Sequence, residues 1–406
     1  MTDVHSASAT FSSMAKSPEC ERAQPRSLYV HIPFCASKCF YCDFTSYVTG
    51  DSERDRYVQA LLTEIRMVRE AYFPGSGTPC LDTIFVGGGT PTMLSAKHWS
   101  QISEALHESF GIGADCEWTT EANPGSADRD LLGHLRSLGV NRVSFGAQTF
   151  NEMLLQAIGR LHSATDVLRS VKAAQQAGFE RVNVDLMLGL PGQTRADVKE
   201  ALAYVEKSGV THVSAYGLKV EEGTPFGKWQ KSGHLTLPDE EDEAEMYEFL
   251  RDTLSERGFV QYEISNFAQM GQEARHNLTY WRNQPYLAVG AGAHGYVHGQ
   301  RYENVKGLRA YEEAVQAGRR PFAKVSVVTP EESMEDSLML ALRLREGLSR
   351  ERFALWHGQA LDAVFGPVIQ SLTARGWLAD DGERIWIPPA YYEVANEVFA
   401  AFIGIL

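Results

Sequence analysis

The sequence contains no apolar run long enough to cross a membrane, no excess of basic residues and few cysteines. Without such a run, the chain is not expected to span a bilayer. The chain has 38 Lys and Arg residues and 52 Asp and Glu residues, so its net charge is −14. This charge argues against a protein that binds nucleic-acid phosphates through clustered basic side chains. Six cysteines among 406 residues make no disulfide framework, so a reducing cytoplasm is the expected compartment.

The amino-terminal segment lacks the features of a targeting signal. Residues 1–26 are polar and rich in Ser and Ala, without the apolar core of a secretory signal. Acidic residues are mixed with the basic ones there, whereas an organellar presequence is poor in acids. We therefore expect residues 1–26 to form a disordered tail.

From residue 27 onward, six β-then-α units follow one another along the chain. The expected strands are 27–32, 82–88, 117–123, 142–148, 181–189 and 212–220. Apolar residues recur at helical spacing between them, as in 56–72 and 96–110. Parallel strands joined by helical crossovers predict an α/β fold. Because a closed barrel needs eight units, we expect an open, partial (β/α)6 barrel, with a doubly wound sheet as the alternative.

The composition changes twice further along the chain, which predicts three regions after the tail. Residues 27–265 carry the β/α units and form the expected core domain. Residues 266–329 are rich in Gly, Asn and aromatic residues, and we expect an irregular connecting region there. Residues 330–406 are expected to form a smaller helical, winged-helix-like domain, whose β-hairpin wing falls within 376–388.

Three cysteines lie within eight positions, directly after the first expected strand. Cys35, Cys39 and Cys42 have the spacing C-x3-C-x2-C. Three thiolates can hold three irons of a [4Fe-4S] cluster and leave the fourth open, and the amino and carboxylate groups of S-adenosylmethionine can chelate that iron. The alternatives are a zinc site that recruits His31 as fourth ligand and a redox thiol pair.

Other unusual residues also follow expected strands, as they should in either α/β architecture. The glycine run GGGTP, residues 87–91, comes directly after the second strand. Three residues without a β-carbon would let backbone approach a ligand closely, and here the ligand group is expected to be the amino group of S-adenosylmethionine. Glu121, Gln148 and Asp185 lie toward the ends of strands three to five.

These motifs together resemble the radical S-adenosylmethionine superfamily. YVHIPFCxxxCxYCxF, GGGTP, EANP, SFGAQ, GRLH and VDLMLGLPGQT occur in the order found in the oxygen-independent coproporphyrinogen III oxidase family, over about residues 27–390. The resemblance implies that Cys35, Cys39 and Cys42 ligate the cluster. The implied residues around S-adenosylmethionine are Tyr29, Tyr41, Gly88, Gly89, Thr90, Glu121, Gln148, Arg160 and Asp185.

The chemistry of these side chains agrees with that implication. Glu121 and Asp185 can accept hydrogen bonds from ribose hydroxyls or an ammonium group, and Gln148 and Arg160 can donate to a carboxylate. The alternative is ordinary polar pairing inside a barrel, for which Arg160 and Asp185 are the expected partners.

Two departures from the oxidase pattern bear on function. The oxidases carry a fourth cysteine two places after the third, where this chain has Phe44, and residues 1–26 show no folded lid over a substrate. The chain instead contains HNLTYW, residues 276–281, which resembles the HemW-type heme chaperones of that family. The resemblance implies that the protein binds heme and passes it to an acceptor apoprotein. Oxidative decarboxylation of coproporphyrinogen III and radical chemistry on another substrate are the alternatives.

His276 is the candidate heme ligand within that motif. An imidazole is a usual axial ligand for heme iron, and Tyr280 and Trp281 offer flat apolar surface for a porphyrin face. The alternative is a loop histidine that bonds a backbone carbonyl, with Trp281 as a packing anchor at the domain junction. His294, in a glycine-rich stretch, is a second candidate.

Overall fold

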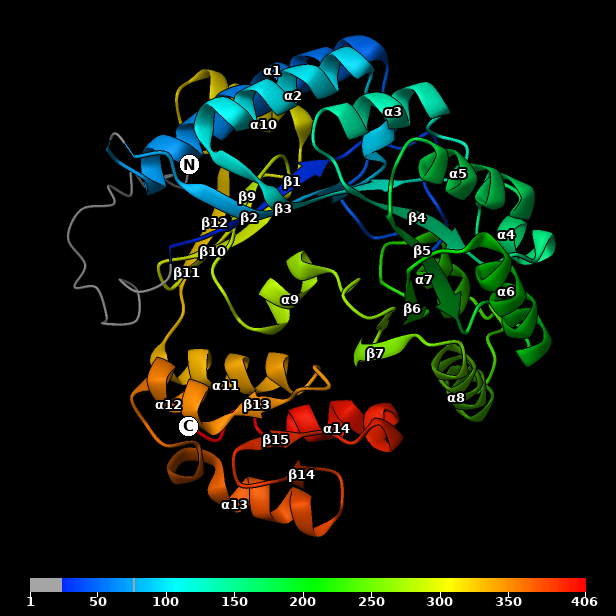
Figure 1. Ribbon diagram of the computed structural model, residues 1–406, viewed down its shortest axis with the longest axis vertical. Helices are drawn as coiled ribbons and strands as arrows, with labels where there is room; N and C mark the ends of the chain where they lie inside the picture. The colour runs from blue at the N-terminus through cyan, green and yellow to red at the C-terminus, as the bar shows by residue number, and fades with distance from the viewer. Residues whose placement is uncertain (1–23, 76) are drawn as a thin grey trace.

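A nine-stranded sheet forms the centre of the molecule (Figure 1). The computed structural model describes residues 24–75 and 77–406, so most of the expected tail, residues 1–23, lies outside the described residues. The strand order is β7-β8-β6-β5-β4-β3-β2-β1-β9. Six of these strands, β1 to β6, pair in parallel and in sequence order. The partial (β/α)6 barrel is therefore confirmed.

The six parallel strands lie where the alternation predicts them, and their ends are extended in places. Their bounds are Ser27–Ile32 (β1), Cys80–Gly88 (β2), Gly111–Ala122 (β3), Arg142–Gln148 (β4), Arg181–Leu188 (β5) and His212–Gly217 (β6). Strand β3 begins six residues before its expected start. Leu28 and His31, which point to opposite faces of β1, are both buried, as expected for a strand covered on both faces.

Helices cover the outer side of this curved sheet (Figure 1). Their bounds are Asp51–Tyr72 (α1), Ala96–Ser109 (α2), Arg129–Ser137 (α3), Glu152–Ala157 (α4), Ala164–Gln176 (α5), Arg195–Ser208 (α6), Pro225–Lys231 (α7) and Glu240–Glu256 (α8), with a 3-10 turn at Pro91–Met93 (η1). Side chains of Ser95, Asp128 and Ser163 accept hydrogen bonds from the first turns of α2, α3 and α5, which stabilises these helix starts.

Three further strands extend the sheet beyond the six that the sequence predicts. Strand β9, Leu287–Val289, pairs in parallel with β1. At the other edge β8, Asn266–Ala268, pairs antiparallel with β6, and β7, Val260–Glu263, pairs with β8. These short strands come from segments that the periodicity does not assign to the barrel, so the sheet closes further around its interior than expected.

The expected irregular region 266–329 is more regular than its composition suggests. Beyond β8 and β9 it contains helix α9, Arg275–Trp281, and helix α10, Leu308–Gln316. An antiparallel sheet is formed by β10, His294–Val297, β11, Gln300–Asn304, and β12, Phe322–Val327. The expectation of irregular structure is wrong here, because backbone pairing compensates for weak side-chain periodicity.

A second hydrophobic core lies below the barrel in Figure 1 and is built from residues after 330. Its elements are α11 Pro330–Ala341, β13 Leu348–Ser349, α12 Arg350–His357, α13 Leu361–Ala374, β14 Ala379–Asp380, β15 Arg384–Trp386, η2 Pro389–Val394 and α14 Ala395–Ala400. Strands β14 and β15 pair antiparallel, so the hairpin expected within 376–388 is present.

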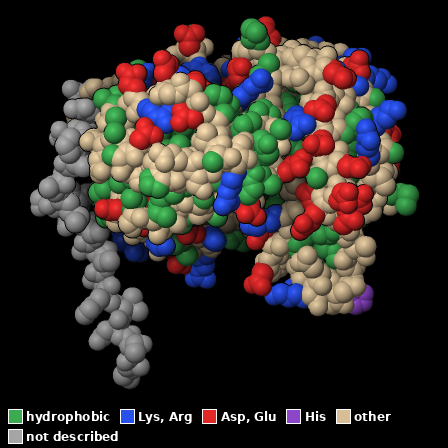
Figure 2. Space-filling view, turned by 90° about the horizontal axis from the view of Figure 1, so that it is seen from below, with side chains coloured by type: hydrophobic (Ala, Val, Ile, Leu, Met, Phe, Trp, Pro, Cys, Tyr) green, Lys and Arg blue, Asp and Glu red, His purple; other side chains and the backbone are tan. Residues whose placement is uncertain are grey.

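The surface reflects the acidic composition. Figure 2 shows Asp and Glu side chains gathered on the right of the face that is seen from below, the side on which Figure 1 places α8. The first turn of α8 carries four acidic residues, whereas its buried Met246, Leu250 and Leu254 face inward at helical spacing. Within the described chain, no helix combines the length and the apolar character needed to cross a membrane.

Candidate functional site

The three clustered cysteines lie on a loop whose two ends are bonded to each other. The loop leaves β1, and the amide of Cys35 donates to the carbonyl of Tyr47 at 3.0 Å, while the amide of Tyr47 donates to the carbonyl of Pro33 at 2.7 Å. All three cysteines are free thiols of intermediate exposure. Closing the loop in this way fixes the segment that carries Cys39 and Cys42 at the carboxyl end of β1.

Hydrogen-bond donors from two other segments reach these sulfurs. Thr90 Oγ1 lies 3.7 Å from Cys35 Sγ, and Arg160 Nη1 lies 3.5 Å from Cys39 Sγ. The pKa of the Cys42 thiol is raised to about 11, chiefly by burial and in smaller part by the nearby Cys39 and Cys35 thiols. The three sulfurs are therefore close enough to repel one another as thiolates, and a bound cation would relieve that repulsion.

The geometry suits a cluster better than a single ion. Within residues 24–75 and 77–406, no three His, Cys, Asp or Glu side chains converge tightly enough to hold one metal ion. In a cubane each thiolate binds a different iron, so the sulfurs need not converge on one point. His31, the fourth ligand of the zinc alternative, has Nδ1 2.9 Å from Tyr29 Oη and Nε2 2.8 Å from the Thr45 carbonyl. Both its nitrogens are thus already bonded.

The glycine run after β2 packs against the cysteine loop. A β-carbon on Gly88 would lie 2.3 Å from the His31 ring, and one on Gly89 would lie 2.7 Å from the carbonyl oxygen of Phe34. Gly88 also has a φ of +112°, which favours glycine. At these two positions the missing side chains make room for the protein's own atoms, and the ligand-facing role that the sequence suggests stays a prediction.

Two carboxylates lie toward the carboxyl ends of β3 and β5, the strands on either side of β4. Glu121 Oε2 accepts a hydrogen bond from the Gly88 amide at 2.8 Å. Asp185 accepts from Ser144 Oγ at 3.1 Å and from Asn183 Nδ2 at 2.7 Å. The pKa of Glu121 is raised to about 7, chiefly by burial and in smaller part by the nearby Asp185, and the hydrogen bond from the Gly88 amide opposes this shift. Burial also raises the pKa of Asp185.

Arg160 contacts the cysteine loop instead of its expected partner. Its guanidinium donates to Cys39 Sγ and to the Gly146 carbonyl, and its Nε is buried with no hydrogen-bond partner in the described chain. No hydrogen bond or ion pair of the described residues joins Arg160 to Asp185, so the expected pairing is wrong. A buried, incompletely bonded guanidinium beside the thiols is the kind of donor that fits an anionic cluster or a carboxylate.

The remaining predicted residues lie around the same opening. Tyr29 Oη forms a hydrogen bond with His31. The pKa of Tyr29 is raised, chiefly by burial and in smaller part by the negative charge of Glu121. Burial raises the pKa of Tyr41, the nearby Arg160 opposes this and the nearby Cys39 adds to it, so Tyr41 lies close to both groups. Gln148 has a φ of +66°, a strained value for a residue with a side chain.

The sequence analysis does not assign Asn123 to the site, although Asn123 contacts a residue that reaches the cysteine loop. Its Nδ2 donates to Thr90 Oγ1 at 2.9 Å, and Thr90 in turn reaches Cys35. Asn123 directly follows β3 within the EANP motif, so its place after a strand was a usable signal. Its bonding partner, which lies 33 positions away, could not be read from the sequence.

His276 is a core residue. It has no exposed surface, its Nδ1 lies 2.7 Å from Thr83 Oγ1, and its Nε2 lies 2.8 Å from Tyr280 Oη. Burial lowers its pKa to about 3. In this conformation His276 presents no free nitrogen to a ligand, so heme ligation by this residue stays a prediction that requires both bonds to break.

The rest of the motif lies at the junction of the two cores. The Trp281 ring packs beneath the Arg343 guanidinium at 4.4 Å, and Arg282 pairs with Glu346 at 2.9 Å. Trp281 therefore acts as the packing anchor that the alternative interpretation expects. His294, the second candidate histidine, is exposed on β10, and its Nε2 lies 3.7 Å from Glu303 Oε1.

Comparisons with known proteins bear on the family. Residues 29–205 match the Radical SAM superfamily model, and residues 328–390 match the HemN C-terminal domain model. Heme chaperone HemW from Bacillus subtilis is 40% identical over 380 residues, which cover 93% of this chain and 99% of that protein. Heme chaperone HemW from Escherichia coli is 34% identical over 361 residues, which cover 88% and 92%. The chain belongs to the HemW family.

The fold is shared with a solved relative of the HemW family. Coproporphyrinogen III oxidase (HemN) from Escherichia coli, described as a radical SAM enzyme, superposes with a TM-score of 0.82 at 23% identity, over 95% of this chain and 91% of that one. At this identity the match shows the radical SAM fold and leaves activity open. The HemW family and the radical SAM architecture are thus both confirmed for this chain.

The raised pKa of Glu121 predicts a pH dependence of stability. The folded protein holds this proton up to about pH 7, whereas the unfolded chain releases it near 4.5. Its contribution to stability is therefore fully present below 4.5 and is lost as the pH rises through 7. Relative to Glu121→Gln, the free energy of unfolding should fall by up to about 1.4 kcal/mol per pH unit in this window. Denaturant unfolding measures it, and parallel pH profiles would contradict the assignment.

A structural role for His276 predicts a loss of stability. His276→Ala leaves Thr83 and Tyr280 without their bonds and should lower the free energy of unfolding by roughly 2 to 4 kcal/mol. His234→Ala is the matched control, because the His234 ring is exposed and lies outside the candidate heme residues, so that its removal should cost little stability. Denaturant unfolding and the heme absorbance spectrum are measured for both variants. A changed heme spectrum in His276→Ala at unchanged stability would make His276 a ligand and contradict the structural role.

Proposed function

We propose that this member of the HemW family is a heme chaperone, which binds heme and passes it to an acceptor apoprotein. The supporting observation is the extent of the relationship: 40% identity continues over 99% of a protein named heme chaperone HemW. Both the barrel and the carboxyl-terminal domain are therefore shared with that relative. The free thiols of the described chain suit a reducing compartment, and we place the protein in the cytoplasm.

We further propose that Cys35, Cys39 and Cys42 hold a [4Fe-4S] cluster with S-adenosylmethionine exchangeably bound at the fourth iron. A bound cluster of this kind supplies an electron to S-adenosylmethionine. The protein's own part is to hold the sulfurs: the closed loop fixes the three cysteines, and the donors Thr90 and Arg160 bond two of them. Such bonds to sulfur tune the reduction potential of a cluster.

The same opening supplies groups for S-adenosylmethionine. Glu121 and Asp185 would accept from its hydroxyl or ammonium groups, and Gln148 and Arg160 would donate to its carboxylate. Gly88, Gly89, Thr90, Tyr29 and Tyr41 complete the proposed set. The support for this set is its placement: the two carboxylates lie on β3 and β5, which both pair with β4, and Thr90 and Arg160 already reach the sulfurs.

The second candidate function is oxidation of coproporphyrinogen III, which the fold shared with HemN favours. Against it stands Phe44, at the position where the oxidases carry a fourth cysteine. Its side chain is 61% exposed, so it neither fills the core nor offers a ligand atom. The chaperone function is therefore preferred.

A paired anaerobic assay tests the function. The cluster is reconstituted without oxygen, heme binding is followed by absorbance, and coproporphyrinogen turnover is followed by product analysis. We expect heme to bind and turnover to be absent, because the chain lacks the fourth cysteine of the oxidases. Cys39→Ala should lose the iron–sulfur absorbance, and Cys80→Ala, at an exposed cysteine outside the loop, should retain it. Turnover at enzyme-like rates, or failure of the protein to bind heme, would contradict the chaperone function.

A further inference from the structure

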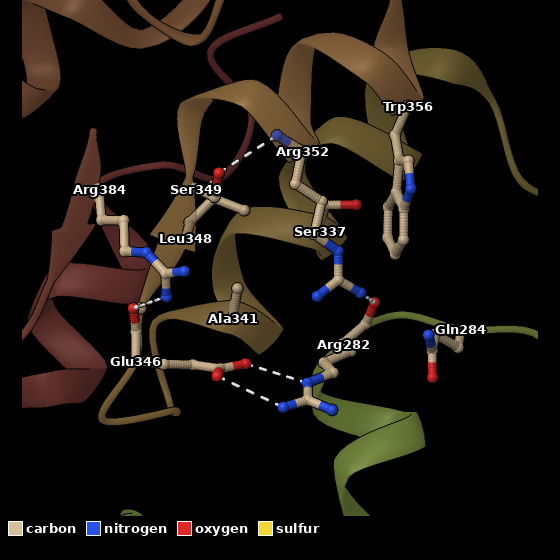
Figure 3. Close-up of a pocket in the computed structure, with 11 residues that line it drawn as sticks. Arg282, Gln284, Ser337, Ala341, Glu346, Leu348, Ser349, Arg352, Trp356 and Arg384 are labelled. Carbon is tan, nitrogen blue, oxygen red and sulfur yellow. Dashed lines mark hydrogen bonds and ion pairs between the residues drawn. The ribbon is translucent and has the colours of Figure 1, made fainter. Parts of the chain in front are cut away.

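A cavity of about 290 Å³ lies between the end of α9 and the carboxyl-terminal domain. Arg282 and Gln284 line it from the α9 side, and α11, α12 and β15 of the second core line the rest. Figure 3 shows the guanidinium groups of Arg282, Arg352 and Arg384 directed toward this space from different segments. The cavity is thus built from the segment that ends the HNLTYW motif and from the domain that packs against it.

The charges around the cavity do not balance. Arg282 is neutralised by Glu346, with nitrogen–oxygen distances of 2.9 and 3.3 Å. Arg352 donates to the Arg282 carbonyl at 2.8 Å, and Arg384 donates to the Glu346 carbonyl at 3.4 Å. Neither Arg352 nor Arg384 forms an ion pair within the described part of the chain. Two positive charges therefore face one cavity in a protein whose net charge is −14.

A bound anion would stabilise the charge of Arg352 in this arrangement. Burial and the nearby charge of Arg282 lower the pKa of Arg352, so its guanidinium is held in a place that disfavours its charge. Arginine forms planar, paired hydrogen bonds with carboxylates, which makes it a specific receptor for them. The uncompensated charge of Arg352 and Arg384 is therefore suited to carboxylate groups.

A flat apolar surface borders the same cavity. The Arg352 guanidinium stacks on the Trp356 ring at 4.2 Å, and Figure 3 shows the indole standing at the side of the open space. The cavity volume is at the lower end of the range of small-molecule sites, about 300 to 1,000 Å³. It would accommodate one edge of a macrocycle with its acidic substituents, while the remainder of the ring stays outside.

We propose that Arg352 and Arg384 bind the two propionate carboxylates of heme, with Trp356 against the edge of the porphyrin. This inference rests on the proposed heme-binding function and gives it a site. The proposed heme site is therefore the arginine cavity, whose first lining residue is Arg282, and not the buried His276. An acidic segment of an acceptor protein offers the same carboxylate chemistry, and the test separates that source from heme.

The test compares arginine variants in the full-length, reconstituted protein. Heme and heme dimethyl ester, in which both propionates are neutral, are titrated by absorbance. Arg352→Gln and Arg384→Gln should each weaken heme binding by about tenfold, the effect of losing one hydrogen-bonded charge pair. The ester should bind the wild-type protein more weakly than heme does, and the two ligands should bind the double variant equally.

Control variants distinguish the loss of carboxylate binding from a general effect of removing an arginine. Arg375 stacks on Trp377 at 5.3 Å in the same domain but does not line the cavity, so Arg375→Gln should leave heme affinity unchanged. Arg384 is exposed and bonds only a carbonyl, so Arg384→Gln remains informative if Arg352→Gln loosens the domain junction. Circular dichroism checks the fold of each variant.

Three results would overturn the inference. If both cavity variants bind heme as Arg375→Gln does, the site is wrong and the chaperone function stands. If they lose binding of a poly-glutamate peptide and keep heme affinity, the cavity belongs to an acidic protein segment. If the wild-type protein binds no heme, the proposed function fails together with this site.

Discussion

The close approach of the GGGTP segment to the cysteine loop is the constraint on which the site depends. At Gly88 and Gly89 there is no space for a β-carbon, because the His31 ring and the Phe34 backbone occupy it. This contact brings Thr90 within reach of Cys35 and lets the Gly88 amide bond Glu121. Neighbouring strand ends are thereby joined around one opening, which is how a partial barrel turns parallel strands into a site.

Local patterns were sufficient to predict the barrel. Alternating apolar strands and amphipathic helices gave all six parallel strands, and the hairpin near the carboxyl terminus followed from its turn sequence. The edge strand β9 was missed, because its pairing with β1 joins segments about 260 residues apart and has no local signal. The sheet formed by β10, β11 and β12 was also missed, although β10 and β11 are joined by a two-residue turn at His298 and Gly299, because the glycine-rich composition of this region predicts irregular structure.

The candidate site was predictable in its members and less so in its contacts. Looking for unusual residues toward strand ends identified Glu121 and Gln148, at the ends of β3 and β4, and Asp185, which lies three residues before the end of β5. The partner of Arg160 was wrong, because a sequence does not tell whether a guanidinium points to a carboxylate or to a thiol. His276 was assigned by its motif, yet its burial depends on Thr83 and Tyr280, which surround it only in the folded chain.

The helix that carries HNLTYW contacts both the barrel and the second core. His276 forms a hydrogen bond with Thr83 of the barrel. Trp281 packs against Arg343, and Arg282, which follows the motif, pairs with Glu346 of the second core. The motif thus connects the barrel to the second core and begins the arginine cavity. Binding of cargo near this helix would act on the contact between the two parts of the protein.

The central claim is that three thiolates leave one iron open for S-adenosylmethionine. Electron paramagnetic resonance of the reconstituted, reduced protein tests this directly, with spectra recorded before and after addition of S-adenosylmethionine. The account predicts a [4Fe-4S] signal that changes on addition, because the ligand binds the iron that no cysteine holds. A chain that assembles no cluster, or one whose signal is unaffected by S-adenosylmethionine, would contradict it.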